Sequence, residues 1–385
     1  MKSNVFNLLF LILLIQCLLF VFKCSPINYD VFEPNVSVKR GVEIIEDNAT
    51  QGKIHYSLPN EVFYSSENYN LLIPISLVYY GDYIKSDYEY ISSKLKYKPK
   101  TIGICGHFVP KNKTPKYTII ATYGALDTYT CSETSIKFFR KFVNYSNYIL
   151  GPELAENSQI IVIDWFRLVM AYQSMEHKFK REIDWIKMIV RYYTSTPKHK
   201  DVIVPAISTA ALINKLARIG VIPSMSNTGL YGLCVGGLNA ALSTLLLNSD
   251  LNIVTINGPP LFIPKKLDKL LRDKVRSGIG TKYFVIFGKT DRVFNHRRHG
   301  KSLAKFISKY ANNVDYLKVQ DNHAGVTSTH VFTCIGVIAT SLIRKTYSII
   351  LFKKEKYAEI PKKFSPNAWK RYVMYDPKAK QKLNV

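Results

Sequence analysis

From about residue 115 onward, short apolar runs alternate with longer segments of helical pattern. The runs are nearly continuous in apolar residues, which is typical of strands buried on both faces. Predicted strands span residues 117–122, 159–165, 229–233, 252–256, 282–287 and 314–319. Predicted helices span residues 204–219, 238–247, 265–276 and 300–310. Strands separated by helices predict an α/β protein with a mostly parallel central sheet and helices on both faces.

The remaining segments differ in composition from this part. Residues 25–110 are rich in Tyr, Ser and Asn and predict an N-terminal extension with short strands, followed by the α/β domain over residues 111–350. Residues 351–385 predict a basic tail, with ten Lys or Arg against three acidic residues from position 353. The hydrophobic share of 47% excludes a mostly disordered chain.

The N-terminus predicts entry into the secretory pathway. Lys2 precedes an apolar run over residues 5–22, which has the form of a secretory signal and the minimum length of a membrane span. Residues 1–24 are therefore predicted to be a signal peptide or an anchor, and the protein to be secreted or membrane-anchored. N-x-[ST] sequons, which agree with that route, occur at Asn35, Asn48, Asn112 and Asn144.

Five cysteines follow the apolar run: Cys24, Cys105, Cys131, Cys234 and Cys334. Cys105 and Cys131 are candidates for a disulfide in an oxidising compartment, and the odd count leaves at least one thiol free. No CxxC pair or Cys/His spacing typical of zinc occurs, so we predict no metal and no cofactor.

The net charge of +25 favours acidic partners, which are anionic lipid surfaces, acidic glycans or nucleic acid. We interpret the basic tail as solvated, with contact to an anionic membrane surface as the alternative. Nucleic acid is disfavoured by the secretory start and by the lack of a binding motif. Residues 295–299 form a basic cluster, Asn-His-Arg-Arg-His. We interpret it as a solvated helix entry, with binding of an anionic head group as the alternative.

One turn carries most of the functional information. The residues Gly232-Leu233-Cys234-Val235-Gly236 come directly after a predicted strand and directly before a predicted helix. This is the form of a nucleophile elbow, G-x-S-x-G, with Cys in place of Ser. Small flanking residues let the backbone approach closely on both sides, and the Val235 N–H is placed to bind an oxyanion. The alternative is a tight turn in which Cys234 only packs.

The order of these motifs resembles that of the α/β-hydrolases, in particular the pancreatic-type lipases and phospholipases of animals. The likeness covers about residues 115–345. Its elbow resembles residues 232–237, its late His resembles His323, and its oxyanion turn resembles Tyr123-Gly124. The resemblance implies that Ala125 supplies a second oxyanion N–H. Two further motifs of the family resemble Val162-Ile163-Asp164-Trp165 followed by Tyr172, and residues 256–262.

Three positions depart from that family. Cys234 stands in place of the serine, Asn257 in place of the acid, and Tyr123 in place of the oxyanion-loop His. Such changes predict a lipase fold with altered or lost ester hydrolysis. Yolk-type relatives of these lipases offer a precedent for binding or storage roles.

The catalytic set has two candidate completions. Residues 284–291 resemble the penultimate strand of generic α/β-hydrolases, which makes Asp291 the acid and His323, about thirty residues later, the base. Cys234, Asp291 and His323 would then resemble the Cys-His-Asp triad of dienelactone hydrolases. Alternatively, Asn257 orients His323 as in Cys-His-Asn proteases.

Two functions follow from these residues. The first is an ester or thioester hydrolase in which Cys234 forms an acyl intermediate. Its substrate would be a lipid or a small ester. The second is a binding protein that keeps the fold without turnover and holds a lipid or a protein partner.

Overall fold

The structure is a computed structural model of the 385-residue chain. It describes residues 43–47, 52–56, 64–65, 69–72, 77–78, 102–110, 113–124, 131–164, 190–192, 194, 197–263, 265–274, 279–291, 293–319, 328–345, 348–352, 357–363 and 371–375. The chain divides into two compact units, Met1–Val38 and Lys39–Val385, and all described residues belong to the second.

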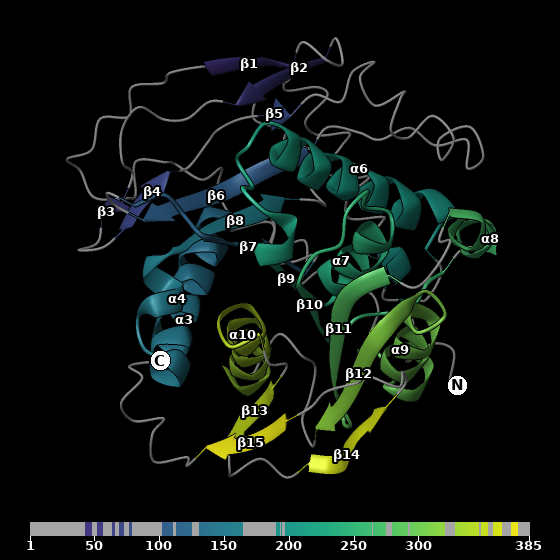
Figure 1. Cartoon of the computed structure of the whole chain (residues 1–385). Helices are drawn as coiled ribbons and strands as arrows, with labels where there is room; N and C mark the ends of the chain where they lie inside the picture. The colour runs from purple at the N-terminus through teal and green to yellow at the C-terminus, as the bar shows by residue number, and fades with distance from the viewer. Residues whose placement is uncertain are drawn as a thin grey trace, which may run out of the picture. The chain divides into compact units, whose positions relative to one another are not determined.

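The core of this unit is one large sheet with the strand order β14-β12-β11-β10-β9-β7-β8-β6-β4-β3 (Figure 1), and β5 also pairs with β6. Its strands are β3 (Tyr64–Ser65), β4 (Tyr69–Leu72), β5 (Leu77–Val78), β6 (Ile102–Pro110), β7 (Tyr117–Thr122), β8 (Ser158–Asp164), β9 (Thr228–Leu233), β10 (Ile253–Asn257), β11 (Ile279–Gly288), β12 (Ala311–Val319) and β14 (Tyr357–Lys363).

Strands β8, β7, β9, β10, β11 and β12 pair in parallel. Strand β6 runs antiparallel to both β8 and β4, and β14 runs antiparallel to β12. Every residue of β7, β9 and β10 is buried, as expected for strands covered on both faces. The register sets Leu233 beside Asn257 and Asn257 beside Ile286, so the carboxyl ends of β9 and β10 lie level next to β11.

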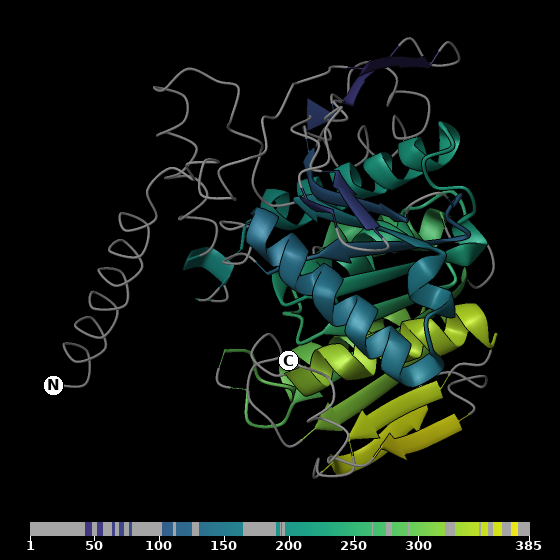
Figure 2. The same cartoon turned by 90° about the vertical axis from the view of Figure 1, so that its left-hand side faces the viewer.

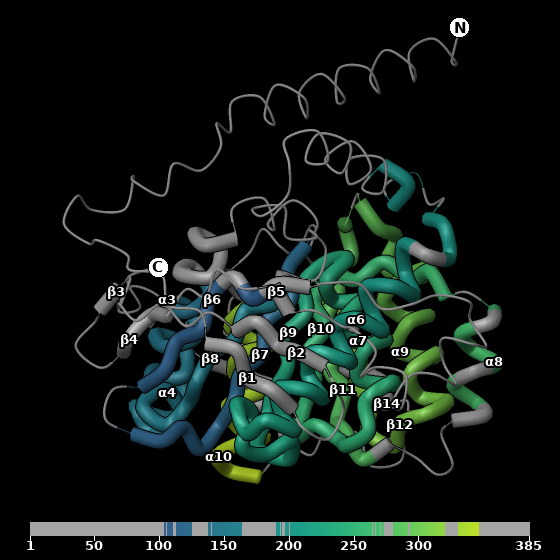
Figure 3. Tube along the Cα trace, turned by 90° about the horizontal axis from the view of Figure 1, so that it is seen from above, coloured from purple at the N-terminus to yellow at the C-terminus, as the bar shows by residue number. Residues whose placement is uncertain are grey.

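Helices cover both faces of the sheet. They are α3 (Cys131–Leu150), α4 (Glu153–Glu156), α6 (His199–Arg218), the short η3 (Met225–Asn227), α7 (Val235–Leu245), α8 (Lys265–Lys274), the π-helix η4 (Arg297–Lys301), α9 (Ser302–Ile307) and α10 (Ser328–Ile343). Helices α6 and α7 pack together on one face, and α3 packs with α10 on the other (Figure 2). Seen from above, α6 and α7 run side by side over the strands (Figure 3).

Two small sheets accompany the large one. Strands β1 (Glu43–Asp47) and β2 (Gly52–Tyr56) form an antiparallel pair. Strands β13 (Ser348–Phe352) and β15 (Arg371–Tyr375) form a parallel pair, and β13 contacts α10.

The predicted α/β class is confirmed, and each predicted strand and helix is found with ends shifted by a few residues. The parallel strands, the antiparallel β6 and the strand-to-helix turn after β9 together form the α/β-hydrolase fold.

The sheet, however, extends beyond the expected domain limits of residues 111 and 350. Upstream, two glycines and the buried His107 interrupt the sequence of β6, IGICGHFVP, so it lacks the continuous apolar run that marked the other strands. Downstream, β14 lies at the sheet edge, where charged residues are common because they discourage pairing with other chains. Its sequence, YAEIPKK, therefore predicts part of a basic tail rather than a strand.

Several predicted features lie outside the described residues: residues 1–40, Asn35, Asn48 and Asn112, and also the side chains of Cys105 and Cys131. Asn144 is described and is exposed on α3. Within the described ranges, no helix has both the length and the apolar content to cross a membrane.

Candidate active site

The junction of β9 and α7 holds Cys234 in an unusual backbone conformation. Cys234 is the N-cap of α7 and has φ 54° and ψ −125°, a region that L-residues rarely adopt. Its N–H donates to the Asn257 carbonyl at 2.8 Å, and its own carbonyl accepts from the Gly237 N–H at 2.9 Å. The strained backbone is therefore held from both sides, as in the nucleophile elbow that the sequence predicts.

The elbow glycines permit the close packing around this turn. A Cβ on Gly232 would lie 2.6 Å from the Ala240 Cβ, and one on Gly236 would overlap the Tyr123 carbonyl and lie 2.8 Å from the Thr122 oxygen. The Thr122 hydroxyl donates to the Gly236 carbonyl at 3.1 Å. The end of β7 is thus packed directly against the first turn of α7.

The N-terminus of α7 can bind an oxyanion. Val235 is the first residue of this 11-residue helix, and its N–H belongs to the first turn, where no helical carbonyl can accept it. The helix dipole adds partial positive charge at the same end. Ala125, predicted to supply the second N–H, lies outside the described residues, whereas Tyr123 directly after β7 is buried.

Cys234 is buried, with 7% of the residue exposed. The phenol of Tyr192 lies within electrostatic reach of it: burial raises the pKa of Tyr192 most, Asp201 raises it next, and Cys234 raises it further. The Tyr192 hydroxyl donates to the Asp201 carbonyl at 3.0 Å. The hydroxyl is therefore held against the first turn of α6.

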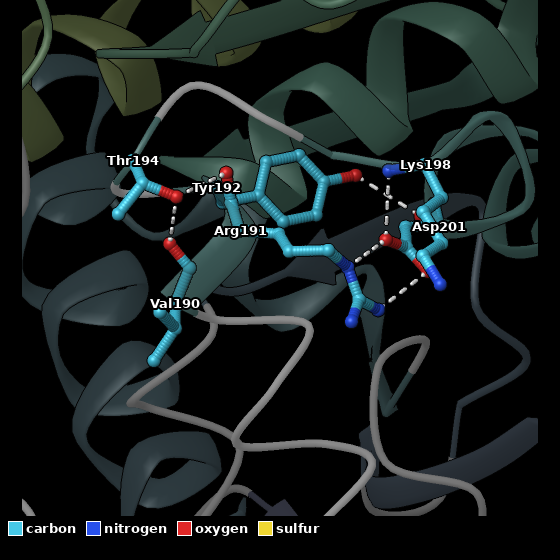
Figure 4. A network of polar contacts seen from close by, with 6 residues as sticks. All are labelled: Val190, Arg191, Tyr192, Thr194, Lys198 and Asp201. Atoms are coloured by element: carbon cyan, nitrogen blue, oxygen red, sulfur yellow. Dashed lines mark hydrogen bonds and ion pairs between the residues drawn. The ribbon is translucent and has the colours of Figure 1, made fainter.

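A polar network holds Tyr192 in place (Figure 4). Arg191 donates from Nε and Nη2 to the two oxygens of the Asp201 carboxylate, at 2.7 and 3.0 Å. The Lys198 N–H donates to the same carboxylate at 2.9 Å, which caps the start of α6. Residues 190–192 are thereby joined to the first turn of α6.

Asn257, the last residue of β10, is fully buried behind the elbow. Its Nδ2 donates to the Tyr231 hydroxyl at 3.2 Å, and its Oδ1 lies 3.1 Å from Nδ1 of His330. His330 is also fully buried, in the first turn of α10. The amide oxygen of Asn257 therefore faces His330, whereas His323, its predicted partner, lies outside the described residues.

Asp291 follows β11 at the same edge of the sheet and is partly buried. Its Oδ1 accepts from the N–H groups of Val293 and Phe294, at 2.7 and 2.9 Å. The carboxylate therefore forms the turn that leads into η4. Strand β10 lies between the strands that carry Cys234 and Asp291.

His299 differs from the expectation of a solvated cluster. Arg297 and Arg298 are exposed as expected, but His299 is partly buried, and its Nδ1 accepts from the Leu261 N–H at 2.9 Å. Burial lowers the pKa of His299, the Asp291 carboxylate raises it, and Arg298 lowers it.

An aromatic row follows from this placement. Edge-to-face contacts join Tyr192 to Phe262 at 5.5 Å, Phe262 to His299 at 5.7 Å and His299 to Phe294 at 5.3 Å. The row joins Tyr192, before α6, to Phe294 in the turn after β11.

The structure thus brings Cys234, Val235, Gly232, Gly236 and Asn257 together, with Asp291 on the same edge. His330, His299 and Tyr192 were missed as site residues. His330 lies in an apolar helix pattern, and Tyr192 precedes the predicted helix at residues 204–219 by twelve positions. Neither position carries a local signal, because both contacts join distant parts of the chain.

No family model and no curated protein matches the chain. Similar solved structures include a putative dienelactone hydrolase from Klebsiella pneumoniae, with 12% identity, 58% of this chain and 82% of that chain covered, and a TM-score of 0.35. Arabidopsis thaliana SOBER1 shares 13% identity over 60% of this chain and 98% of its own, with a TM-score of 0.39. An esterase from Pyrococcus furiosus shares 13% over 66% and 90%, with a TM-score of 0.34.

Proposed function

We propose that this chain is a carboxylic ester or thioester hydrolase in which Cys234 is the nucleophile. The observation that carries the proposal is the strained backbone of Cys234 at the N-terminus of α7. A non-glycine residue in such a conformation costs about 1–3 kcal/mol. A cysteine that only packs does not need it, whereas a nucleophile presented on a turn does.

The reaction would follow the usual course of acyl transfer. The general base takes the proton of the Cys234 thiol as the sulfur attacks the acyl carbonyl, and the Val235 N–H donates to the oxyanion. Collapse expels the alcohol or thiol, which takes up a proton from the general acid. Water then attacks the acyl-cysteine with the general base removing its proton, which releases the carboxylic acid and restores the thiol.

For the acid–base group we propose His323, with Asp291 orienting it and the Ala125 N–H completing the oxyanion hole. The position of Asp291 supports this choice over Asn257, because the Asn257 amide oxygen already faces His330 at 3.1 Å. His323 follows β12, the strand next to the one that precedes Asp291, in the order nucleophile, acid, His.

The second candidate is a binding protein without turnover. Asn257 at the end of β10 favours it, because this amide is part of a fully buried pair and carries no charge to stabilise an imidazolium. In this case the surface around the elbow would bind a lipid or a protein partner.

Alkylation of Cys234 distinguishes the two functions. The purified protein is treated with iodoacetamide near neutral pH, and mass spectrometry locates the adduct. The hydrolase predicts rapid modification of Cys234, slowed in His323→Ala, and a trapped acyl-cysteine with an activated ester. Cys334 is the internal control, because it is fully buried and its pKa is raised by burial. Modification of Cys234 only together with Cys334, after unfolding, would contradict a working nucleophile.

We also propose that the protein contacts an anionic lipid surface through η4 and α9. Arg297, Lys301 and Lys305 are exposed and lie four residues apart, so they share one side of the helix. Residues 293–310 contain no acidic residue, and Val293 is the exposed large hydrophobic residue of the described parts, at 36%. Such a basic stripe attracts anionic lipid head groups.

Vesicle sedimentation tests this contact. Wild type is expected to bind vesicles of phosphatidylserine and phosphatidylcholine but not phosphatidylcholine alone. Replacing Arg297, Lys301 and Lys305 by Gln should weaken binding at least tenfold, since each basic residue near the surface contributes about 1 kcal/mol. The triple change Lys116→Gln, Lys198→Gln and Lys269→Gln, at exposed positions elsewhere, removes the same charge and is the control. Equal loss in both variants would show only a general effect of net charge.

A secretory route is proposed for the same protein. Asn144 supports it, because this sequon is exposed on α3 and accessible to a glycosyltransferase. Expression in a eukaryotic secretory host is expected to give a product whose mass falls on glycosidase treatment, and Asn144→Gln should remove one step. An unglycosylated product would contradict this route.

A further inference from the structure

The segment between β10 and α8, residues 258–263, borders the elbow and is attached to a histidine from another element. It begins directly after Asn257, whose carbonyl accepts the Cys234 N–H. Three residues on, the Leu261 N–H donates to Nδ1 of His299 in η4 at 2.9 Å. One end of the segment is thus tied to the nucleophile turn and its middle to the imidazole.

The next residue extends the contact toward Cys234. Phe262 lies between His299 and Tyr192, with ring centroids 5.7 and 5.5 Å apart. The Tyr192 phenol is within electrostatic reach of the Cys234 thiol. Residues 261–263 are partly buried, and a Cβ on Gly237 in the first turn of α7 would lie 3.4 Å from the Cβ of Pro259, so the segment packs against that turn.

The hydrogen bond from Leu261 depends on the charge of the ring. Nδ1 can accept an N–H only in the neutral tautomer that carries its proton on Nε2, because both nitrogens of an imidazolium are donors. Protonation of His299 therefore replaces an acceptor with a donor facing the Leu261 N–H.

The charged groups around His299 act in opposite directions. The Asp291 carboxylate, from the turn after β11, favours the imidazolium, whereas burial and Arg298 of η4 itself oppose it. Burial is the largest effect, so the neutral ring predominates at neutral pH and the hydrogen bond to Leu261 breaks only under acidic conditions.

We propose that neutral His299 is a positioning residue that holds residues 258–263 against the elbow, and that its protonation releases this segment and changes access to Cys234. The inference does not require turnover, because access to the thiol exists in a hydrolase and in a binding protein alike.

Two substitutions separate the hydrogen bond from the ring and from the charge. His299→Phe keeps an aromatic ring against Phe262 and Phe294 but removes the acceptor. His299→Asn removes the titratable ring but places Oδ1 near the position of Nδ1, where it can accept from Leu261. His199→Phe, at an exposed position in the first turn of α6, is the matched control.

Hydrogen exchange of the peptide that covers residues 258–263 is the primary measurement. After correction for intrinsic rates, exchange in wild type should accelerate about fivefold on acidification, with the midpoint of the His299 titration followed by NMR. His299→Phe should exchange fast, and His299→Asn slowly, at every pH. Exchange that does not follow the His299 titration, or His299→Phe behaving like wild type at pH 7.5, would overturn the proposal.

Alkylation of Cys234 at pH 7.5 is the second measurement. His299→Phe should change the rate several-fold, whereas His299→Asn and His199→Phe should match wild type. Equal rates in all four proteins would refute the effect on access, even if exchange changes. Absence of ester turnover would refute the hydrolase proposal and leave both of these measurements unaffected.

Discussion

The backbone strain at Cys234 predicts an unusual order of stability between two variants. Cys234→Ala and Cys234→Gly both remove the thiol, but only alanine retains a Cβ at φ 54°. Strain of about 2 kcal/mol is relieved by glycine. Glycine in turn costs about 0.8 kcal/mol of extra conformational entropy relative to alanine. Cys234→Gly is therefore expected to be more stable than Cys234→Ala by about 1 kcal/mol.

Urea denaturation followed by circular dichroism measures this difference, and a thermal scan should show a shift of about 2 °C. Ala241→Gly, inside the same helix α7, is the control, since it should lose about 1 kcal/mol. If Cys234→Gly is less stable than Cys234→Ala, the turn stores no strain. The observation that carries the proposed function would then be lost.

Three further predictions concern the surroundings of the elbow. Gly236→Ala should cost about 2–4 kcal/mol, because the methyl group overlaps the Tyr123 carbonyl, which is backbone and cannot rotate away; a cost below about 0.5 kcal/mol would contradict this packing. Tyr192→Phe should lower the free energy of unfolding by about 1 kcal/mol, because it removes the hydrogen bond to the Asp201 carbonyl. Unchanged stability in urea would show that this hydrogen bond does not stabilise the fold. Burial lowers the folded-state pKa of His299 below its ordinary 6.5, so the native state binds fewer protons and stability should fall as pH drops below about 6.5. His299→Asn should reduce that loss in urea titrations at pH 7.5 and 5, and an identical loss would contradict the assigned pKa direction.

The parts of the fold that the sequence predicted are those with local signals. Buried strands such as β7 and β10 have continuous apolar runs, and the elbow has its glycines on both sides of Cys234. Strands β6 and β14 lacked such a run, one because glycines and His107 interrupt it and the other because it is a charged edge strand.

The candidate site was predicted less completely, because its polar contacts join distant segments. Asn257 and His330 are 73 residues apart, and Leu261 and His299 are 38 apart. No spacing rule relates such pairs. The sequence marked Asn257 as a departure from an acidic position, but only the packing of α10 against β10 shows what its amide faces.

A cysteine in place of the serine is chemically compatible with Asn257 in place of the acid. A thiol ionises far more readily than a hydroxyl, so a cysteine nucleophile depends less on a carboxylate behind its base. Cys-His-Asn sites work on this principle. The pairing of Asn257 with His330 nevertheless removes it from that role, which leaves Asp291 as the orienting group if the site is catalytic.

A serine variant tests this assignment, because a serine nucleophile depends on a carboxylate behind its base more strongly than a cysteine nucleophile does. Cys234→Ser is expected to react with a fluorophosphonate probe if Asp291 orients the base. Adding Asp291→Asn should then slow labelling by up to about 10⁴-fold, the effect of the same change in a serine triad. The new amide keeps an Oδ1 for Val293 and Phe294, so the turn remains intact.

Adding Asn257→Asp to Cys234→Ser is the opposing arm of this experiment. Its carboxylate would face His330, so we expect no gain in labelling. A serine variant that is labelled only when Asn257→Asp is present would show that the acid acts from the end of β10. The end of β11 would then be excluded, and the base would be a histidine that Asn257 contacts.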